Sequence, residues 1–171
     1  MKRRIFLSMV TVAALSGCAV TPLVPAETAS QINLREISVD VSSFEGVRGR
    51  DFSVAPAQLQ QDIAGALASQ FTTSPQGNAV MRVTVDQVNL VSPGQSLLLG
   101  GTSTIKGTVS ISNVATGSDI LPVTNVSGLA DGSYAPGGII GALSTKSPEN
   151  DYENTVASFA SDVKNRLFGA N

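Results

Sequence analysis

The sequence predicts a single α+β domain in which two amphipathic helices cover one face of a mixed or antiparallel sheet of about four strands. Two observations carry this prediction. Four segments alternate apolar with polar residues, and two longer segments repeat apolar residues every three or four positions. They follow one another as strand, helix, strand, strand, strand and helix (β-α-β-β-β-α). We assign residues 32–171 to this domain, since about 140 residues can bury roughly two-thirds of their unfolded surface.

The first strand and the first helix show different periodicities. Apolar and polar residues alternate across residues 37–42, as in a strand with one buried face. Pro56 suits the first turn of a helix, and residues 56–71 are predicted to be helical. The apolar stripe of this helix consists of Leu59, Ile63, Leu67 and Phe71. Between the two elements, residues 44–51 are predicted to form a loop. Its Gly46-Val47-Arg48-Gly49 has the GxxG spacing of some RNA-binding modules, but it lacks their flanking helices, and we interpret it as a plain turn.

Three further strands are predicted between residues 81 and 129. In the first of them the apolar residues change parity after Val85, which predicts a bulge near Asp86-Gln87. Residues 105–112 and 121–129 alternate again, and a turn at 115–119 joins them as a hairpin. Pro122 cannot donate to a strand ladder, so the last strand is expected at an edge. We expect the first strand-helix-strand unit to be a right-handed parallel crossover and the following strands to form an antiparallel meander.

A second helix is predicted to begin at Pro148 and to end before Gly169. Ser147 can cap it, acidic residues follow in its first turn, and basic residues lie in its last turn, in agreement with the helix dipole. Its apolar stripe consists of Tyr152, Val156, Phe159, Val163 and Leu167. We expect this stripe and the stripe of the first helix to share one core.

Two glycine-rich loops, 92–102 and 131–145, hold apolar residues. The first contains no Gly-Lys-Ser/Thr and is therefore not interpreted as a phosphate-binding loop. With the strand directions above, both loops share one end of the domain with the loop at 44–51. Apolar residues on exposed loops often mark interaction sites, so we hypothesise a partner-binding tip there. Its candidate residues are Arg48, Arg50, Leu97, Leu98, Leu99, Tyr134, Ile139 and Ile140. The alternative is that these residues fold back over the open face of the sheet.

The N-terminus has the features of a secretory leader. Lys2, Arg3 and Arg4 precede an apolar run over residues 5–15. As a helix this run would rise about 16 Å, well short of the roughly 30 Å of a membrane core. Residues 1–17 are therefore interpreted as a signal peptide. The only cysteine, Cys18, follows directly, and residues 18–31, which include two prolines, are interpreted as a lipidated N-terminus with a flexible linker.

The tetrapeptide Leu15-Ser16-Gly17-Cys18 resembles the lipobox of bacterial lipoproteins. The resemblance implies that Cys18 carries a thioether-linked diacylglycerol, that the leader is removed and that the new N-terminus is acylated. In enterobacterial relatives an aspartate after the cysteine retains the protein in the inner membrane, so Ala19 implies the outer membrane, with the domain facing the periplasm. The alternative is an ordinary secretory leader with a chance cysteine.

The order of the elements is similar to that of small periplasmic lipoproteins such as the LPS-assembly lipoprotein, the TolB N-terminal domain and the penicillin-binding-protein activator lipoproteins. No motif of these families is present, so the resemblance assigns no functional residue. An uncharacterised lipoprotein family fits the order equally well.

Composition argues against catalysis and against nucleic-acid binding. The chain has no histidine and, once Cys18 is lipidated, no free thiol, which removes His-based acid–base pairs, catalytic triads and His or Cys metal sites. Carboxylate pairs, as in glycosidases, remain open, but the one dense acidic group, at residues 149–153, is already explained by the helix dipole. Loss of the basic leader residues takes the formal charge from −2 to −5, opposite to what DNA or RNA requires. We therefore expect a non-enzymatic envelope lipoprotein, without cofactor or metal, that binds an envelope protein or assists assembly or transport. The alternative is a lipid- or glycan-binding module whose apolar loops form the mouth of a pocket.

Overall fold

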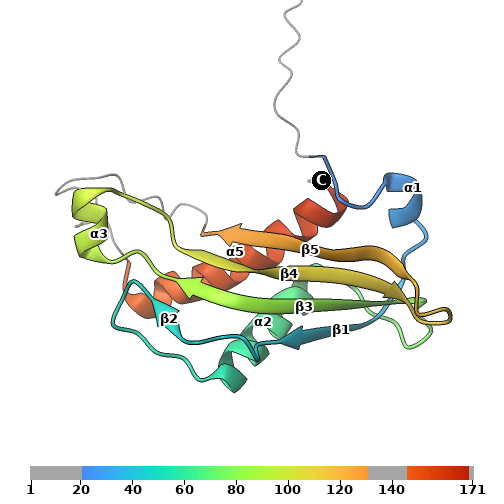
Figure 1. The fold of residues 1–171 in the computed structure, drawn as a ribbon, viewed down its shortest axis with the longest axis horizontal. Helices are drawn as coiled ribbons and strands as arrows, with labels where there is room; N and C mark the ends of the chain where they lie inside the picture. The colour runs from blue at the N-terminus through green and yellow to red at the C-terminus, as the bar shows by residue number, and fades with distance from the viewer. Residues whose placement is uncertain (1–20, 131–145, 170–171) are drawn as a thin grey trace, which may run out of the picture.

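The computed structural model describes residues 21–130 and 146–169, which form one sheet with helices packed against it (Figure 1). The α+β fold class predicted from the sequence is confirmed. In chain order the elements are α1 (Ala26–Ala29), β1 (Leu34–Asp40), β2 (Val47–Arg48), α2 (Pro56–Gln70), β3 (Ala79–Asn89), α3 (Pro93–Leu98), β4 (Thr104–Asn113), β5 (Asp119–Leu129) and α5 (Pro148–Phe168).

The main strands of the sheet lie in the order β1-β3-β4-β5. β1 and β3 are parallel and are connected through α2, while β3, β4 and β5 form an antiparallel meander, as the sequence predicted. The short β2 pairs in parallel with the last residues of β3. Within the described part of the chain β5 is an edge strand, which agrees with the position of Pro122 in it.

β3 contains the bulge that its change of parity predicts. Its pairing with β4 shifts by one residue between Val85 and Gln87. Because side chains alternate between the two faces of a strand, the extra residue returns Val88 to the buried face that Val83 and Val85 occupy. The whole strand therefore keeps one apolar face toward the helices.

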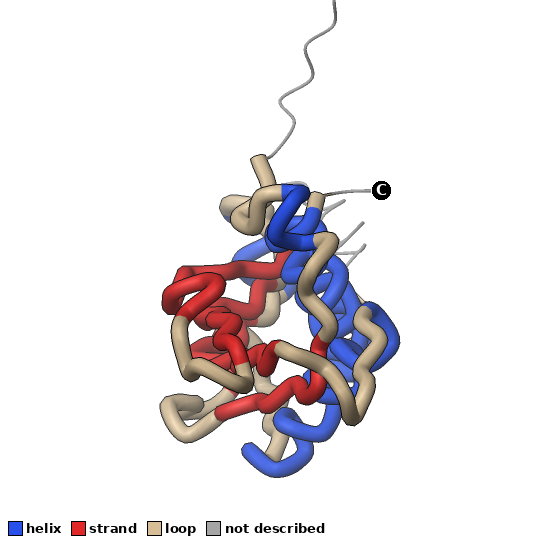
Figure 2. Tube along the Cα trace, turned by 90° about the vertical axis from the view of Figure 1, so that its right-hand side faces the viewer, coloured by secondary structure: helices blue, strands red, loops and turns tan. Residues whose placement is uncertain are grey.

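The core lies between the sheet and the pair α2 and α5, which lie on the same side of the strands (Figure 2). Ile63 and Leu67 of α2 are fully buried in the same cluster as Val163 of α5, so the predicted single core is confirmed. Gly128 of β5 lies directly under α5, and a Cβ at this position would clash with the backbone of Phe159. This close approach of helix and strand explains the glycine within β5.

α5 begins and ends where the sequence predicts. The Ser147 Oγ accepts a hydrogen bond from the Asn150 N–H at 3.2 Å, and Pro148 occupies the first turn. Gly169 follows the last turn with a φ of 89°, a conformation that glycine adopts at no steric cost.

Three segments that we predicted to be irregular contain regular or packed structure. The loop at 44–51 includes β2, which forms because the chain runs beside the end of β3. The loop at 92–102 includes α3, which Ser92 caps by accepting a hydrogen bond from the Gln95 N–H. Within the predicted linker at 18–31, α1 forms and Val24 is buried against the domain. The packed domain therefore begins before residue 32, because this segment contacts the end of α5.

Candidate functional site

Among the described residues, three consecutive large apolar side chains with high exposure lie on α3 and directly after it. Leu97, Leu98 and Leu99 are 45%, 79% and 82% exposed. We call these three residues the leucine tip. The other large apolar side chains with high exposure in the described ranges, Val123 and Leu129, belong to β5. Exposed apolar residues that cluster in this way commonly mark an interaction site.

The leucine tip lies at one end of the sheet, the end at which α5 begins (Figure 1). α3 follows the end of β3, and Gly100, with a φ of 71°, starts the return of the chain into β4. β2 pairs with the same end of β3. The segments 44–51 and 92–102 therefore share one end of the domain.

A buried hydroxyl connects the two ends of the segment that carries α3. Ser103 is fully buried, and its Oγ accepts a hydrogen bond from the Val91 N–H at 2.9 Å. The carbonyl of Ser103 accepts a hydrogen bond from the Ala130 N–H at 3.0 Å, which brings the end of β5 to the same point. The leucine tip is thus carried by a short helix whose two flanks are held together.

A buried ion pair lies next to this hydroxyl. Ser103 Oγ donates to Asp151 Oδ2 at 2.6 Å, and the same carboxylate oxygen is 3.7 Å from Arg50 Nη1. Arg50 Nη1 also donates to the carbonyl of Lys146 at 2.8 Å. The side chains of Arg50 and Asp151 are only 9% and 6% exposed, so each charge depends on the other for compensation. We call Arg50, Ser103 and Asp151 the basal network, because they join the segments on which the leucine tip stands.

The predicted tip residues therefore lie in three different environments. Leu97, Leu98 and Leu99 gather on the surface. Arg48 lies at the same end, exposed and 3.0 Å from Glu45, in a surface pair that contributes little stability. Arg50 is buried in the basal network, so its predicted place on the exposed tip is corrected. Cys18, Tyr134, Ile139 and Ile140 lie outside the described residues.

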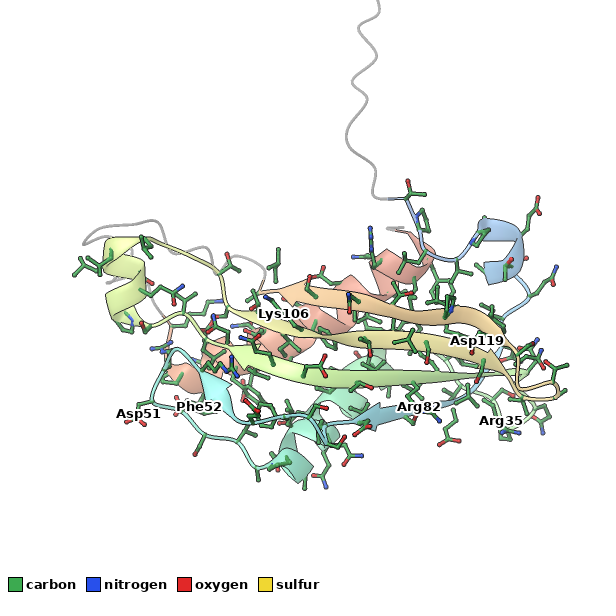
Figure 3. The ribbon with its side chains drawn as sticks, viewed as in Figure 1. Arg35, Asp51, Phe52, Arg82, Lys106 and Asp119 are labelled. Atoms are coloured by element: carbon green, nitrogen blue, oxygen red, sulfur yellow. The ribbon has the colours of Figure 1, made fainter. Side chains whose placement is uncertain are left out.

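The face of the sheet opposite the helices is polar and presents little apolar surface that the leucine tip could cover. Arg82 of β3 and Lys106 of β4 belong to this face and are exposed (Figure 3). Their strand neighbours on the same face are mostly threonine and serine. Such a polar face is stable in water without a cover. The high exposure of Leu98 and Leu99 thus contradicts, for these residues, the alternative that they fold back over the sheet.

Ser103 and Asp151 were not predicted to act together. The sequence assigned Asp151 to the dipole of the second helix, and it does lie in the first turn of α5. Its contact with Ser103, however, joins residues 48 positions apart. No local pattern of residues indicates such a contact.

A second polar contact connects the two helices. Tyr152 of α5 donates its hydroxyl hydrogen to Asp62 Oδ2 of α2 at 2.8 Å. Burial, and then the hydrogen bond and the charge of Asp62, raise the pKa of Tyr152 above its ordinary value of 10.0. This phenol therefore stays protonated at neutral pH, and its hydrogen bond to Asp62 links the two helices.

A groove of about 1310 Å³ lies beside β5. Its walls include Asn125, Ser127 and Leu129 of β5, Arg166 of α5, and Pro22. The leucine tip does not line it. In the described ranges there is no group of three or more His, Cys, Asp or Glu residues placed to hold a metal ion. Nor does any helix of these ranges have the length and apolar character needed to cross a membrane.

In comparisons with known proteins, no protein-family model and no curated protein matches the chain. Several solved structures resemble it at low identity. Protein XCC0632 from Xanthomonas campestris is 9% identical, with 80% of each chain covered and a TM-score of 0.40. The PelC dodecamer from Paraburkholderia phytofirmans is 10% identical, covers 77% of this chain and 85% of its own, and gives a TM-score of 0.39. A protein proposed to be a lipoprotein, from Caulobacter crescentus CB15, is 14% identical, with 77% and 86% covered and a TM-score of 0.33. At these scores the likenesses carry no argument about function.

Proposed function

We propose that this chain is a cell-envelope lipoprotein, anchored through lipidated Cys18, that acts without catalysis by binding a partner protein through the leucine tip. One observation carries the proposal. Three consecutive leucines, 45%, 79% and 82% exposed, lie on and directly after a short helix at one end of the sheet. Binding residues often lie on loops that a rigid scaffold positions.

The leucine tip suits an apolar hollow on a partner. Complete burial of one leucine side chain contributes about 1.5–3 kcal/mol. Leu98 and Leu99 keep most of their surface in water, so a partner that covers both would gain most of that amount twice, less the cost of association. α3 itself carries no charged residue, so covering it desolvates no charged side chain.

The basal network explains how the leucine tip stays exposed in the unbound domain. If α3 moved onto the sheet, the hydrogen bond from Val91 to Ser103 and the contact of Ser103 with Asp151 would be strained or lost. A buried polar group that loses its partner costs about 1–3 kcal/mol. This cost opposes collapse of the tip and keeps it available for binding.

The anchor is proposed on the lipobox-like tetrapeptide that ends at Cys18, and the outer membrane on Ala19. The proposal of a non-enzymatic role is supported by the absence of histidine from the chain.

Site-specific photo-crosslinking in intact cells tests the leucine tip. A photoreactive residue at position 98 should form a discrete product with one envelope protein. The same residue at position 123, which is 74% exposed on β5, is the matched control and should not form that product. Leu98→Asp should then reduce copurification of that protein tenfold or more, while Val123→Asp leaves it unchanged.

Two outcomes would refute the proposal. In the first, Leu98→Asp captures the partner as well as the native chain does. In the second, the unlipidated domain binds phospholipid vesicles and Leu98→Asp abolishes that binding. The leucine tip would then be a membrane-inserting element and not a protein-binding one.

A further inference from the structure

The N-terminal segment is fixed to the end of α5. The Leu23 N–H donates to the carbonyl of Arg166 at 2.9 Å, and the Val24 N–H donates to the carbonyl of Leu167 at 3.0 Å. These carbonyls belong to the last turn of α5, where a helix leaves its own acceptors unpaired. Val24 is only 2% exposed. From Leu23 onward the chain is therefore part of the packed domain and cannot serve as a free tether.

Little chain remains between this point and the proposed lipid anchor. From Cys18 to Pro22 the chain can span at most about 14 Å when it is fully extended. β5, with 11 residues, is about 36 Å long by comparison. A lipid on Cys18 consequently stays on the side of the domain where Pro22 lies and cannot reach the opposite side.

The surface around Pro22 is the edge of the sheet beside the groove. Pro22 lines that groove together with Asn125, Ser127 and Leu129 of β5 and Arg166 of α5. We call these five residues the β5-edge face. In both ribbon and tube views the chain enters the domain on this side, and α2 lies on the opposite side (Figures 1 and 2).

The β5-edge face has the chemistry of a surface that meets lipid headgroups. The Leu129 N–H points away from β4 and donates to Asp162 Oδ2 at 2.9 Å. By the alternation of an antiparallel ladder, the backbone groups of Ser127 and Asn125 also point outward. Polar backbone and side-chain groups can bond to phosphate and to interfacial water, while Leu129, 53% exposed, adds an apolar contact.

The charges around the groove are mixed and do not by themselves attract this surface to a membrane. Lys106 and Arg166 line the groove, but Asp86 and Asp162 line it too. The short tether makes weak polar and apolar contacts sufficient, because a connection of a few residues raises the local concentration of the second contact to the millimolar range.

We propose that the β5-edge face rests on the phospholipid surface in which Cys18 is anchored, an inference that rests on the proposed lipidation. The long axis of the domain then runs along the membrane. The leucine tip, at one end of this axis (Figure 1), is presented sideways to a partner embedded in the same membrane.

Fluorescence quenching in vesicles tests this orientation. The chain has one cysteine, which the lipid occupies, so an introduced cysteine is the only thiol that a dye can label. Ser127→Cys reports from the β5-edge face, and Gln61→Cys, exposed on α2, is the matched control. The lipidated full-length mature protein is reconstituted into phosphatidylcholine vesicles that carry a nitroxide on the headgroup. Quenching at position 127 should exceed that at position 61 several-fold.

A second variant separates the tether from the surface. Twelve glycine and serine residues inserted between Val20 and Thr21 should leave flotation with vesicles intact and reduce quenching at position 127 to the level at position 61. Equal quenching at both positions in the native-length protein, with flotation intact, would overturn the orientation alone. Failure of the native-length protein to float with the vesicles would overturn the lipid anchor, and the orientation with it.

Discussion

The basal network makes a sharp prediction about stability. Asp151→Ala removes the carboxylate that lies 3.7 Å from Arg50 and accepts the Ser103 hydroxyl at 2.6 Å. Removal of one partner of a buried ion pair costs about 3–5 kcal/mol, because the other charge is left without compensation. Arg50 keeps its hydrogen bond to the Lys146 carbonyl, so we expect the lower half of that range. For a domain of this size the expected fall in Tm is about 6–16 °C.

A double-mutant cycle distinguishes the charge from the hydrogen bond. Asp151→Asn keeps an oxygen that can accept from Ser103 but leaves the Arg50 charge alone, and Arg50→Met leaves the Asp151 charge alone. Replacement of both partners of a buried pair by neutral groups is often close to neutral. The double variant should therefore be more stable than either single variant, with a coupling of about 1–3 kcal/mol.

Urea unfolding of the mature chain carrying Cys18→Ser is the appropriate assay. The chain has no tryptophan, so unfolding is followed by far-UV circular dichroism. Additive effects of the two substitutions, or a loss below 1 kcal/mol for Asp151→Ala, would show that the network does not hold this end of the domain together.

Three further predictions concern the anchor, the core and the helix link. Cys18→Ser should release the protein into the soluble periplasmic fraction or leave an unprocessed precursor, as fractionation and immunoblotting would show; normal membrane anchoring of this variant would contradict the lipid anchor. Leu67→Ala, at a fully buried position of α2, should lower the free energy of unfolding by about 2–5 kcal/mol, whereas Leu98→Ala on the surface should change it by less than about 0.5 kcal/mol; a loss below 0.5 kcal/mol at Leu67 would place α2 outside the core. The raised pKa of Tyr152 means that the folded state holds the phenolic proton more tightly than the unfolded state does. Its contribution to stability is present below the ordinary tyrosine pKa of 10.0 and is lost as the pH rises above it. Tyr152→Phe should remove this part of the alkaline loss in denaturation curves between pH 9 and pH 11, and an unchanged pH dependence would contradict the link to Asp62.

The fold could be predicted where burial imposes a period on the sequence. The stripes of α2 and α5 and the alternation in β3 and β4 reflect one buried face each, and the change of parity after Val85 even located the bulge. The order of these elements then limited the connections to a parallel crossover followed by a meander. Pattern and structure agree here because the same apolar contacts determine both.

The parts that were missed depend on contacts between distant segments or on very short elements. α3 has a local signal, since Ser92-Pro93 resembles the Ser147-Pro148 start of α5, but a helix of fewer than two turns leaves no periodic stripe. β2 exists only because the chain passes beside the end of β3. The docking of Leu23 on α5 joins the two ends of the domain, and the two prolines nearby indicated a linker instead.

Arg50 shows why the candidate site could be predicted only in part. An arginine in a loop is most often exposed, and the prediction placed Arg50 near the leucines because its loop was expected at the same end of the domain as theirs. The structure buries Arg50 3.7 Å from Asp151. The attraction between the two charges is largely offset there by the cost of removing both from water, so the pair adds little net stability. What such a pair can provide is a defined geometry, because each charge has one acceptable partner and any slip of the segments separates them. The leucine tip needs this property more than it needs stability. An apolar helix left on a loosely held loop would turn toward the nearest apolar surface, whereas a helix fixed to a charged base is held in water, available to the partner that we propose.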